Sequence, residues 1–204
     1  MENIYFDFLP LELNVILSNY LTSEDLNNLC ELFPDCQDEQ FWIQLFNYKF
    51  GKLPDYLPKD IDYQKFYMGI INYLEHETNI EIIVSKHKKS DDEWQRKHGG
   101  NFTEYLRYLQ KNSLNIPKFD YNKLENYTIL FLLNRKLLSK YNINTIMNKY
   151  INDIDILTSI VNNYEITHEI KHKFTEMFNH LNRMYLDEDE YEKWEHILDK
   201  VREK

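Results

Sequence analysis

Apolar residues recur at helical spacing along most of this 204-residue sequence, and little interrupts them. Only four glycines and five prolines are present, whereas a fold built from many short strands needs such turn residues at each chain reversal. Because 43% of the residues are apolar and 15% are aromatic, the chain can bury a core of ordinary size. The sequence therefore predicts an all-α protein.

Charge and cysteine content narrow the functional classes. Acidic residues outnumber basic residues 34 to 24, a net charge of -10, so the average surface repels a nucleic-acid backbone. No apolar run is long enough to span a membrane, and the first residues lack the positive charge of a secretion signal. Cys30 and Cys36 cannot build a disulfide framework and fit a reducing compartment, with Cys30 expected in the core. We expect an intracellular protein of the cytoplasm or nucleus that binds neither nucleic acid nor membrane.

Three short helices are predicted in the first fifty residues. The first follows Pro10, because proline suits the start of a helix, where its missing N–H is not needed. The second begins at Thr22-Ser23, whose hydroxyls offer N-caps and precede the carboxylates of Glu24 and Asp25. The third begins near Asp38 and ends at Gly51, a typical helix-ending residue.

A link punctuated by two prolines, residues 53–58, separates these helices from the rest of the chain. We therefore predict a three-helix module over residues 1–54 and an irregular α-helical domain over residues 55–204. Helical segments in the second part are expected near 62–75, 103–112, 121–139, 142–151, 153–163, 165–185 and 187–203. Residues 80–84 are β-branched and predict a strand or a turn of helix, and residues 85–101 predict a polar loop or a frayed helix.

The first helix carries more apolar surface than one face can hide. One broad arc of it consists of Leu13, Ile16, Leu17, Tyr20 and Leu21. Leu11 and Val15 add apolar surface on the other side. A helix that is apolar on more than one side lies between two neighbours, so part of this surface should pack against something beyond the module. That neighbour is either a partner protein or the second domain.

The ordered pattern of these helices resembles the F-box family. It reads Leu9-Pro10-x-Glu12-Leu13-x-x-Ile16-Leu17-x-x-x-Leu21-x-x-x-Asp25-Leu26-x-x-Leu29, followed by Trp42-x-x-Leu45 and Phe50-Gly51. The spacing is similar to the opening Leu-Pro, the Asp-Leu second helix and the late Trp of that family. The resemblance covers about residues 7–54, and the chain departs from the family pattern at Phe33-Pro34-Asp35-Cys36.

The resemblance implies an interaction protein rather than an enzyme, with no cofactor. Members of the family dock on the small adaptor subunit of a cullin-RING ubiquitin ligase, and the region after the module captures a protein target. By resemblance, the residues that form the adaptor interface or directly support it are Leu9, Pro10, Leu13, Ile16, Leu17, Leu26, Leu29 and Trp42. A structural helical protein with no ligase link, in which the three helices only cap their own second domain, stays open as an alternative.

One enzymatic alternative comes from the His168-Glu169-Ile170-Lys171-His172 segment. This spacing puts two imidazoles on one helical face, with Glu169 as the base that would activate a zinc-bound water. Candidate third ligands are His180, Glu188, Glu192 and Glu195. Against a zinc hydrolase, Lys171 would place a cation beside the metal, and no sheet edge is predicted along which a substrate could bind. We therefore expect no metal site here and interpret the segment as a charged, solvent-facing helix.

Overall fold

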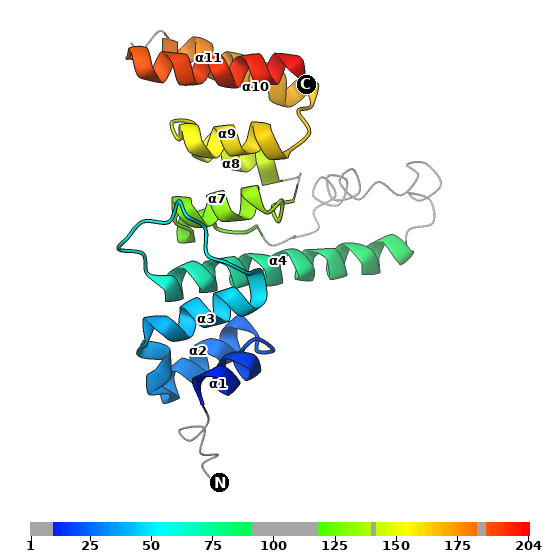
Figure 1. Ribbon diagram of the computed structural model, residues 1–204. Coiled ribbons are helices and arrows are strands. Elements are labelled where there is room, and N and C mark those ends of the chain that lie inside the picture. Colours follow the sequence, from blue (N-terminus) through cyan, green and yellow to red (C-terminus); the bar gives the residue numbers. More distant parts are fainter. Residues whose placement is uncertain (1–9, 91–117, 140–141, 183–186) are drawn as a thin grey trace. The chain divides into compact units, whose positions relative to one another are not determined.

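The computed structural model describes residues 10–90, 118–139, 142–182 and 187–204 (Figure 1). Within these ranges the chain forms nine α-helices and two short 3-10 helices, and no strand occurs in them. The predicted all-α class is therefore confirmed for the described residues. Leu9 and the helix predicted near 103–112 lie outside them.

The chain divides into two compact units, Met1–Tyr127 and Thr128–Lys204. The boundary predicted after residue 54 falls inside unit 1, because the helices on either side of it pack together. That residues 1–54 fold as a separate module stays a prediction.

The first part of unit 1 contains the three helices expected from the sequence, α1 (Leu11–Ser18), α2 (Ser23–Leu32) and α3 (Glu39–Phe50). A 3-10 turn, η2 (Pro34–Gln37), joins α2 to α3. The predicted end signals are confirmed, since the Thr22 hydroxyl accepts a hydrogen bond from the Asp25 N–H at 3.1 Å and the Asp38 carboxylate accepts one from the Gln40 N–H at 2.9 Å. Gly51 ends α3 with a φ of 82°, a left-handed conformation that glycine adopts without strain.

The long helix α4 (Tyr63–Ser90) packs against α2 and α3. Aromatic side chains contribute to the contact between α3 and α4: the Phe46 and Phe66 rings stack at 5.3 Å between centroids, and the Trp42 and Tyr67 rings lie 5.9 Å apart. Such pairs stabilise a core beyond their buried area. Burial of the Tyr67 phenol also raises its pKa. The three short helices and α4 therefore share one core.

The strand predicted as one option for residues 80–84 is wrong, because this segment lies inside α4. The other option, a turn of helix, is what the structure contains. Val84 is buried while Ile82 is exposed, so this β-branched stretch buries one side only and serves as an ordinary amphipathic part of the helix. Helix α4 also continues through residues 85–90, which were expected to form a loop or a frayed helix.

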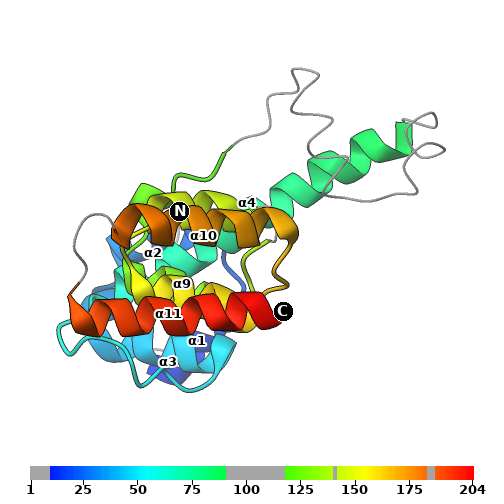
Figure 2. The same cartoon turned by 90° about the horizontal axis from the view of Figure 1, so that it is seen from above.

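The helices of unit 2 follow the predicted segments closely. They are α8 (Ile143–Lys149), α9 (Ile154–Asn163), α10 (His168–Asn182) and α11 (Glu188–Glu203), after α7 (Asn126–Asn134), whose first two residues belong to unit 1. Helix α11 packs on α9 and on α10, and Figures 1 and 2 display this layering within the unit. The core of unit 2 includes the fully buried side chains of Phe131, Phe174 and Trp194.

The helix predicted over residues 121–139 is shorter than expected. It is divided into a 3-10 turn, η3 (Tyr121–Lys123), and α7. Helix α7 stops because Lys136 takes a left-handed conformation with a φ of 55°. The Leu137 N–H then donates to the Leu132 carbonyl at 2.8 Å and the Lys136 N–H to the Leu133 carbonyl at 3.0 Å. This is a Schellman helix end, formed here without the glycine that usually announces it.

Candidate partner-docking surface

The apolar side chains Leu13, Ile16 and Leu17 of helix α1 face away from the core of unit 1. The side chains it buries are those of Asn14, Val15 and Ser18. We define the α1 outer face as Leu13, Ile16, Leu17 and Tyr20, which are 45%, 37%, 47% and 77% exposed. Leu13, Ile16 and Leu17 recur at intervals of three and four residues and form one stripe of α1, and Tyr20 follows two residues after the end of the helix. The stripe is apolar and accessible, which is the reverse of an ordinary amphipathic helix.

A hydrogen bond explains how polar residues can occupy the inner side of α1. The Asn14 amide donates to the Asp35 carboxylate at 3.1 Å, which ties α1 to the η2 turn. Val15 supplies an apolar contact beside it and is 4% exposed. Because one partner is charged, this bond is stronger than a neutral one and offsets part of the cost of burying the amide.

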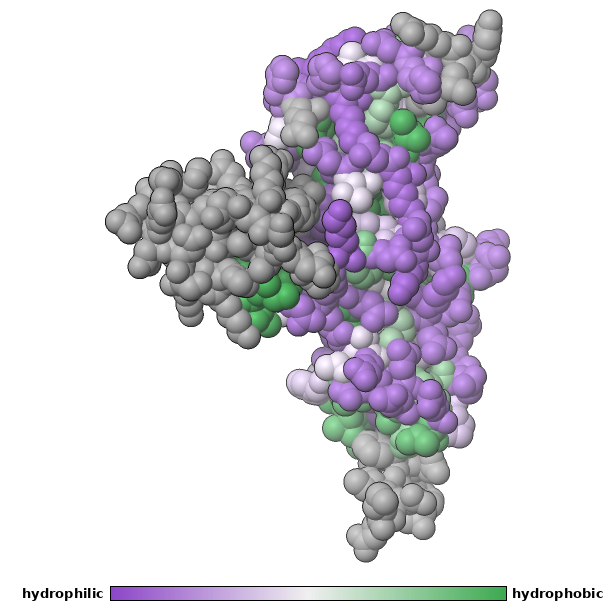
Figure 3. All heavy atoms as spheres, turned by 180° about the vertical axis from the view of Figure 1, so that it is seen from behind, coloured by the Kyte–Doolittle hydropathy of each residue, from purple (hydrophilic) through white to green (hydrophobic). Residues whose placement is uncertain are grey.

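A further apolar side chain is exposed at the end of α2. Leu32, the last residue of α2, is 77% exposed. Figure 3 shows green, hydrophobic side chains gathered at the end of unit 1 where α1 lies. Single exposed apolar residues are ordinary, whereas several on one helix indicate a surface that contacts something else.

The residues expected at the adaptor interface differ in their exposure. Pro10, Leu13, Ile16 and Leu17 are exposed and available to a partner. Leu26 and Trp42 are buried, at 1% and 2% exposed, so they support the helices from inside. Leu29 is half-buried. Leu32 was not among the expected residues, because its position lies beside the apolar stripe of α2 rather than within it.

A cavity of about 240 Å³ lies between α1, α2, η2 and α3. Its lining residues are Asn14, Leu17, Ser18, Leu21, Leu29, Phe33, Asp35, Cys36 and Phe41. We call this space the α1–α2 pocket. Most of its lining is apolar, and Leu17 belongs both to it and to the α1 outer face. A large apolar side chain that contacts the outer face is thus adjacent to a hollow of suitable chemistry.

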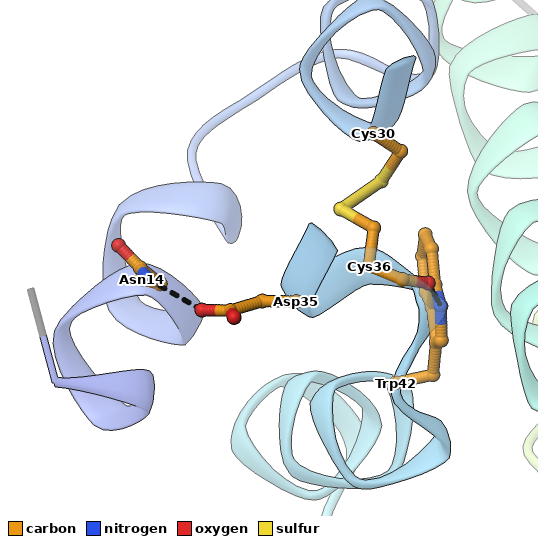
Figure 4. The surroundings of a disulfide bond; sticks show 5 residues. All are labelled: Asn14, Cys30, Asp35, Cys36 and Trp42. Atoms are coloured by element: carbon orange, nitrogen blue, oxygen red, sulfur yellow. Dashed lines mark hydrogen bonds between the residues drawn. A yellow bond between two sulfur atoms is a disulfide. The ribbon is translucent and has the colours of Figure 1, made fainter. Parts of the chain in front are cut away.

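The two cysteines depart from expectation. They form a disulfide bond between Cys30 of α2 and Cys36 of η2, with Cα atoms 5.2 Å apart (Figure 4). The prediction that Cys30 is a core residue is also wrong, since it is half-buried while Cys36 is 2% exposed. The spacing of six residues gave no reason to expect the bond, because it depends on the η2 turn reversing the chain.

The His168–His172 segment forms the first turns of α10, so the helix predicted for this segment is confirmed. His168 is exposed, and His172 pairs with Glu176 at 3.4 Å on an exposed face, while the side chain of Glu169 lies outside the described part. Across the described ranges, no group of three or more His, Cys, Asp or Glu residues is arranged to hold a metal ion. The third ligand that zinc would need is therefore not supplied by any described side chain.

A second hollow, of about 480 Å³, lies in unit 1 between α4 and the η3 region. Its lining residues are Lys65, Met68, Gly69, Asn72, His76, Lys118, Phe119, Asp120, Lys123 and Leu124. The His76 ring meets Phe119 edge to face at 5.3 Å, and partial burial lowers the pKa of His76. Lys65 hydrogen-bonds Glu125, which raises the pKa of the lysine. We call this the α4–η3 groove, and its mixed lining suits a polar ligand.

No helix in the described portion of the chain has the length and apolar character needed to cross a membrane. Comparison with protein-family models, with curated proteins and with solved structures finds no match for this chain. The fold class and the surface chemistry of the described residues are therefore the basis for a proposed function.

Proposed function

We propose that this chain is an interaction protein whose F-box-like module, residues 1–54, docks through α1 on the small adaptor subunit of a cullin-RING ubiquitin ligase. The helical domain over residues 55–204 recruits or sequesters a protein target. The single observation that carries the proposal is the α1 outer face. Three apolar side chains of α1, together with Tyr20 just after it, face solvent while polar side chains of the same helix are buried. Folding alone does not favour this orientation, so a partner that covers the face supplies the missing reason.

The F-box resemblance supports the identity of that partner. Pro10, Leu13, Ile16 and Leu17 belong both to the motif and to the exposed surface of unit 1. In an interface, apolar area contributes to binding after association costs are subtracted, and a few central side chains carry most of the energy. Leu17, at the border of the α1–α2 pocket, is the side chain we expect to be most important.

The buried members of the motif support the same proposal in another way. Leu26 and Trp42 pack into the core, where the Trp42 indole N–H donates to the Cys36 carbonyl at 2.8 Å. They hold α2, η2 and α3 in place beneath α1, so their role is to position the docking surface rather than to contact a partner.

The test is a pull-down of the purified adaptor subunit with the full chain. The variant carries Leu13→Asp with Leu17→Asp, which puts two charges into the proposed interface, and we expect capture to be lost. Ile82→Asp is the matched control, because Ile82 is 46% exposed on α4 of the same unit and resembles Leu17 in exposure. This control should bind as the unchanged chain does.

Both chains should retain their helix content by circular dichroism, because all three positions face solvent. Equal capture by the unchanged chain and by the double variant would refute docking through α1. Stoichiometric zinc in the purified protein that is lost in His172→Ala would favour the hydrolase alternative instead.

A further inference from the structure

The η2 turn, Pro34–Gln37, is attached to three different helices. The Cys30–Cys36 disulfide joins it to α2, the Asn14–Asp35 hydrogen bond joins it to α1, and the Cys36 carbonyl accepts the Trp42 indole N–H of α3. Figure 4 shows these attachments converging on the turn from three sides. The disulfide is the one covalent attachment among the three.

This turn is also a wall of the α1–α2 pocket. Phe33, Asp35 and Cys36 contribute to the lining, opposite residues of α1 that include Leu17. The position of the turn therefore sets the width of the pocket, and through Asp35 it influences how α1 lies on the unit. A change confined to the turn reaches the proposed docking surface without passing through the aromatic core.

We propose that the Cys30–Cys36 bond is a reversible redox switch on the docking surface, with the oxidised chain as the form that binds. The inference rests on the proposed function, which places the chain in a compartment where dithiol reductants act. Disulfides in such compartments are transient or regulatory rather than structural. The turn lies where the sequence departs from the F-box pattern, at Phe33-Pro34-Asp35-Cys36, so the device belongs to this chain rather than to the family resemblance.

The switching step is thiol–disulfide exchange with a dithiol. A reductant thiolate attacks the sulfur of Cys30, the more accessible residue of the pair, and the Cys36 sulfur leaves with the bonding electrons and takes up a proton. The second thiol of the reductant then displaces Cys30 as a thiol. The protein gains two electrons and two protons, and the dithiol is oxidised to its own disulfide. The reverse exchange with an oxidised dithiol restores the bond.

Reduction should loosen the turn without unfolding unit 1. Two hydrogen bonds still hold η2, and the stacked rings of Phe46 and Phe66 join α3 to α4, whereas the cysteines belong to α2 and η2. The loss falls on the geometry of the α1–α2 pocket, because a preorganised surface binds more tightly than one that must be ordered on binding. We expect the loss of this preorganisation to weaken binding on the order of tenfold.

The experiment measures the affinity of the full chain for purified adaptor before and after treatment with dithiothreitol. We expect the oxidised chain to bind on the order of tenfold more tightly than the reduced chain. Cys30→Ser with Cys36→Ser is the matched control: it should bind like the reduced chain under both conditions, which also excludes an effect of the reductant on the adaptor. Alkylation and mass spectrometry should find no free thiol in the oxidised chain.

Other outcomes overturn the inference in distinguishable ways. Equal affinity of the oxidised and reduced chains would end the switch while leaving docking through α1 intact. Failure of both forms to bind would remove the proposed function and the switch with it. Loss of helix content on reduction would show that the bond maintains the fold, and the local switch would then be rejected. Hydrogen exchange of the Trp42 indole N–H, assigned with Trp42→Phe, should accelerate on reduction, and unchanged exchange would break the link between bond and turn.

Discussion

Glu75, midway along α4, accepts two hydrogen bonds from Ser23, the first residue of α2. The Ser23 backbone N–H donates at 2.8 Å and its hydroxyl at 2.5 Å, across a separation of 52 residues. The first N–H groups of a helix lack partners within it and carry the positive end of the helix dipole, so a carboxylate placed there is stabilising. This contact ties the first three helices to α4 through one side chain.

Replacement of Glu75 should therefore weaken unit 1. Glu75→Ala removes a charged acceptor from two donors that are partly buried, and we expect the free energy of unfolding to fall by about 1–3 kcal/mol. Hydrogen exchange measured on α2 peptides, together with urea denaturation, would record this loss. Glu81→Ala, on an exposed position of the same helix, should change the stability by less than about 0.5 kcal/mol.

Buried and exposed residues of the motif should differ in how much they contribute to stability. Leu26→Ala should lower the free energy of unfolding by about 2–5 kcal/mol, because the side chain is 1% exposed and its loss leaves a cavity. Ile16→Ser should change it by less than about 0.5 kcal/mol, because this side chain faces solvent. Thermal and urea denaturation of the two variants would separate these cases. A large loss in Ile16→Ser would mean that α1 is held by its outer face after all.

Helix positions in unit 2 were predictable because each segment carries regular spacing and a local stop. Asp153 and Asp187, for example, accept hydrogen bonds from the N–H groups of Ile156 and Glu190, so the caps are visible in the sequence itself. The orientation of α1 was less accessible. Its apolar arc could be recognised, but which side of the helix faces the core depends on Asn14 meeting Asp35, a contact between residues 21 positions apart.

The errors have physical causes of the same kind. Residues 80–84 are β-branched, and their helical state comes from packing of Val84 within unit 1 rather than from local preference. The Cys30–Cys36 bond required the reversal at η2, and the early end of α7 required Lys136 in a conformation that lysine rarely takes. Tertiary contacts decided each of these features, and a single sequence does not display them.

The left-handed backbone at Lys136 suggests a substitution that stabilises the protein. Lys136→Gly should raise the free energy of unfolding by about 0.5–1 kcal/mol, because glycine adopts a positive φ without steric cost. Lys193→Gly provides the comparison: it lies at an exposed position inside α11 and should lower stability by about 1 kcal/mol. Thermal denaturation of both variants measures the contrast. If Lys136→Gly is less stable than the unchanged chain, the contacts of the lysine side chain contribute more to the free energy of unfolding than its backbone strain costs.

A buried phenol in unit 2 makes a similar comparison possible. The Tyr164 hydroxyl donates to the Leu138 carbonyl at 3.0 Å, and burial raises the pKa of this phenol to about 12. Tyr164→Phe leaves the carbonyl without that donor and should lower the free energy of unfolding by about 1–2 kcal/mol. Tyr191→Phe is the control, because the Tyr191 hydroxyl donates a long hydrogen bond of 3.4 Å to the Glu195 carboxylate on an exposed surface. Equal stabilities of the two variants would contradict the assigned role of Tyr164.

The α4–η3 groove predicts a dependence of stability on pH through His76. Partial burial of His76 against the Phe119 ring lowers its pKa from 6.5, so the folded chain takes up a proton less readily than the unfolded chain. Stability from this group is complete above about pH 6.5 and is lost as the pH falls through the lower pKa of the folded state. His76→Gln cannot titrate, so the stability difference between the unchanged chain and this variant should shrink between pH 7.5 and pH 5. Urea denaturation at the two pH values measures that difference directly. Acidic groups elsewhere affect the stability of both chains alike, so they cancel in the difference. A difference that stays constant would show that protonation of His76 is not coupled to folding.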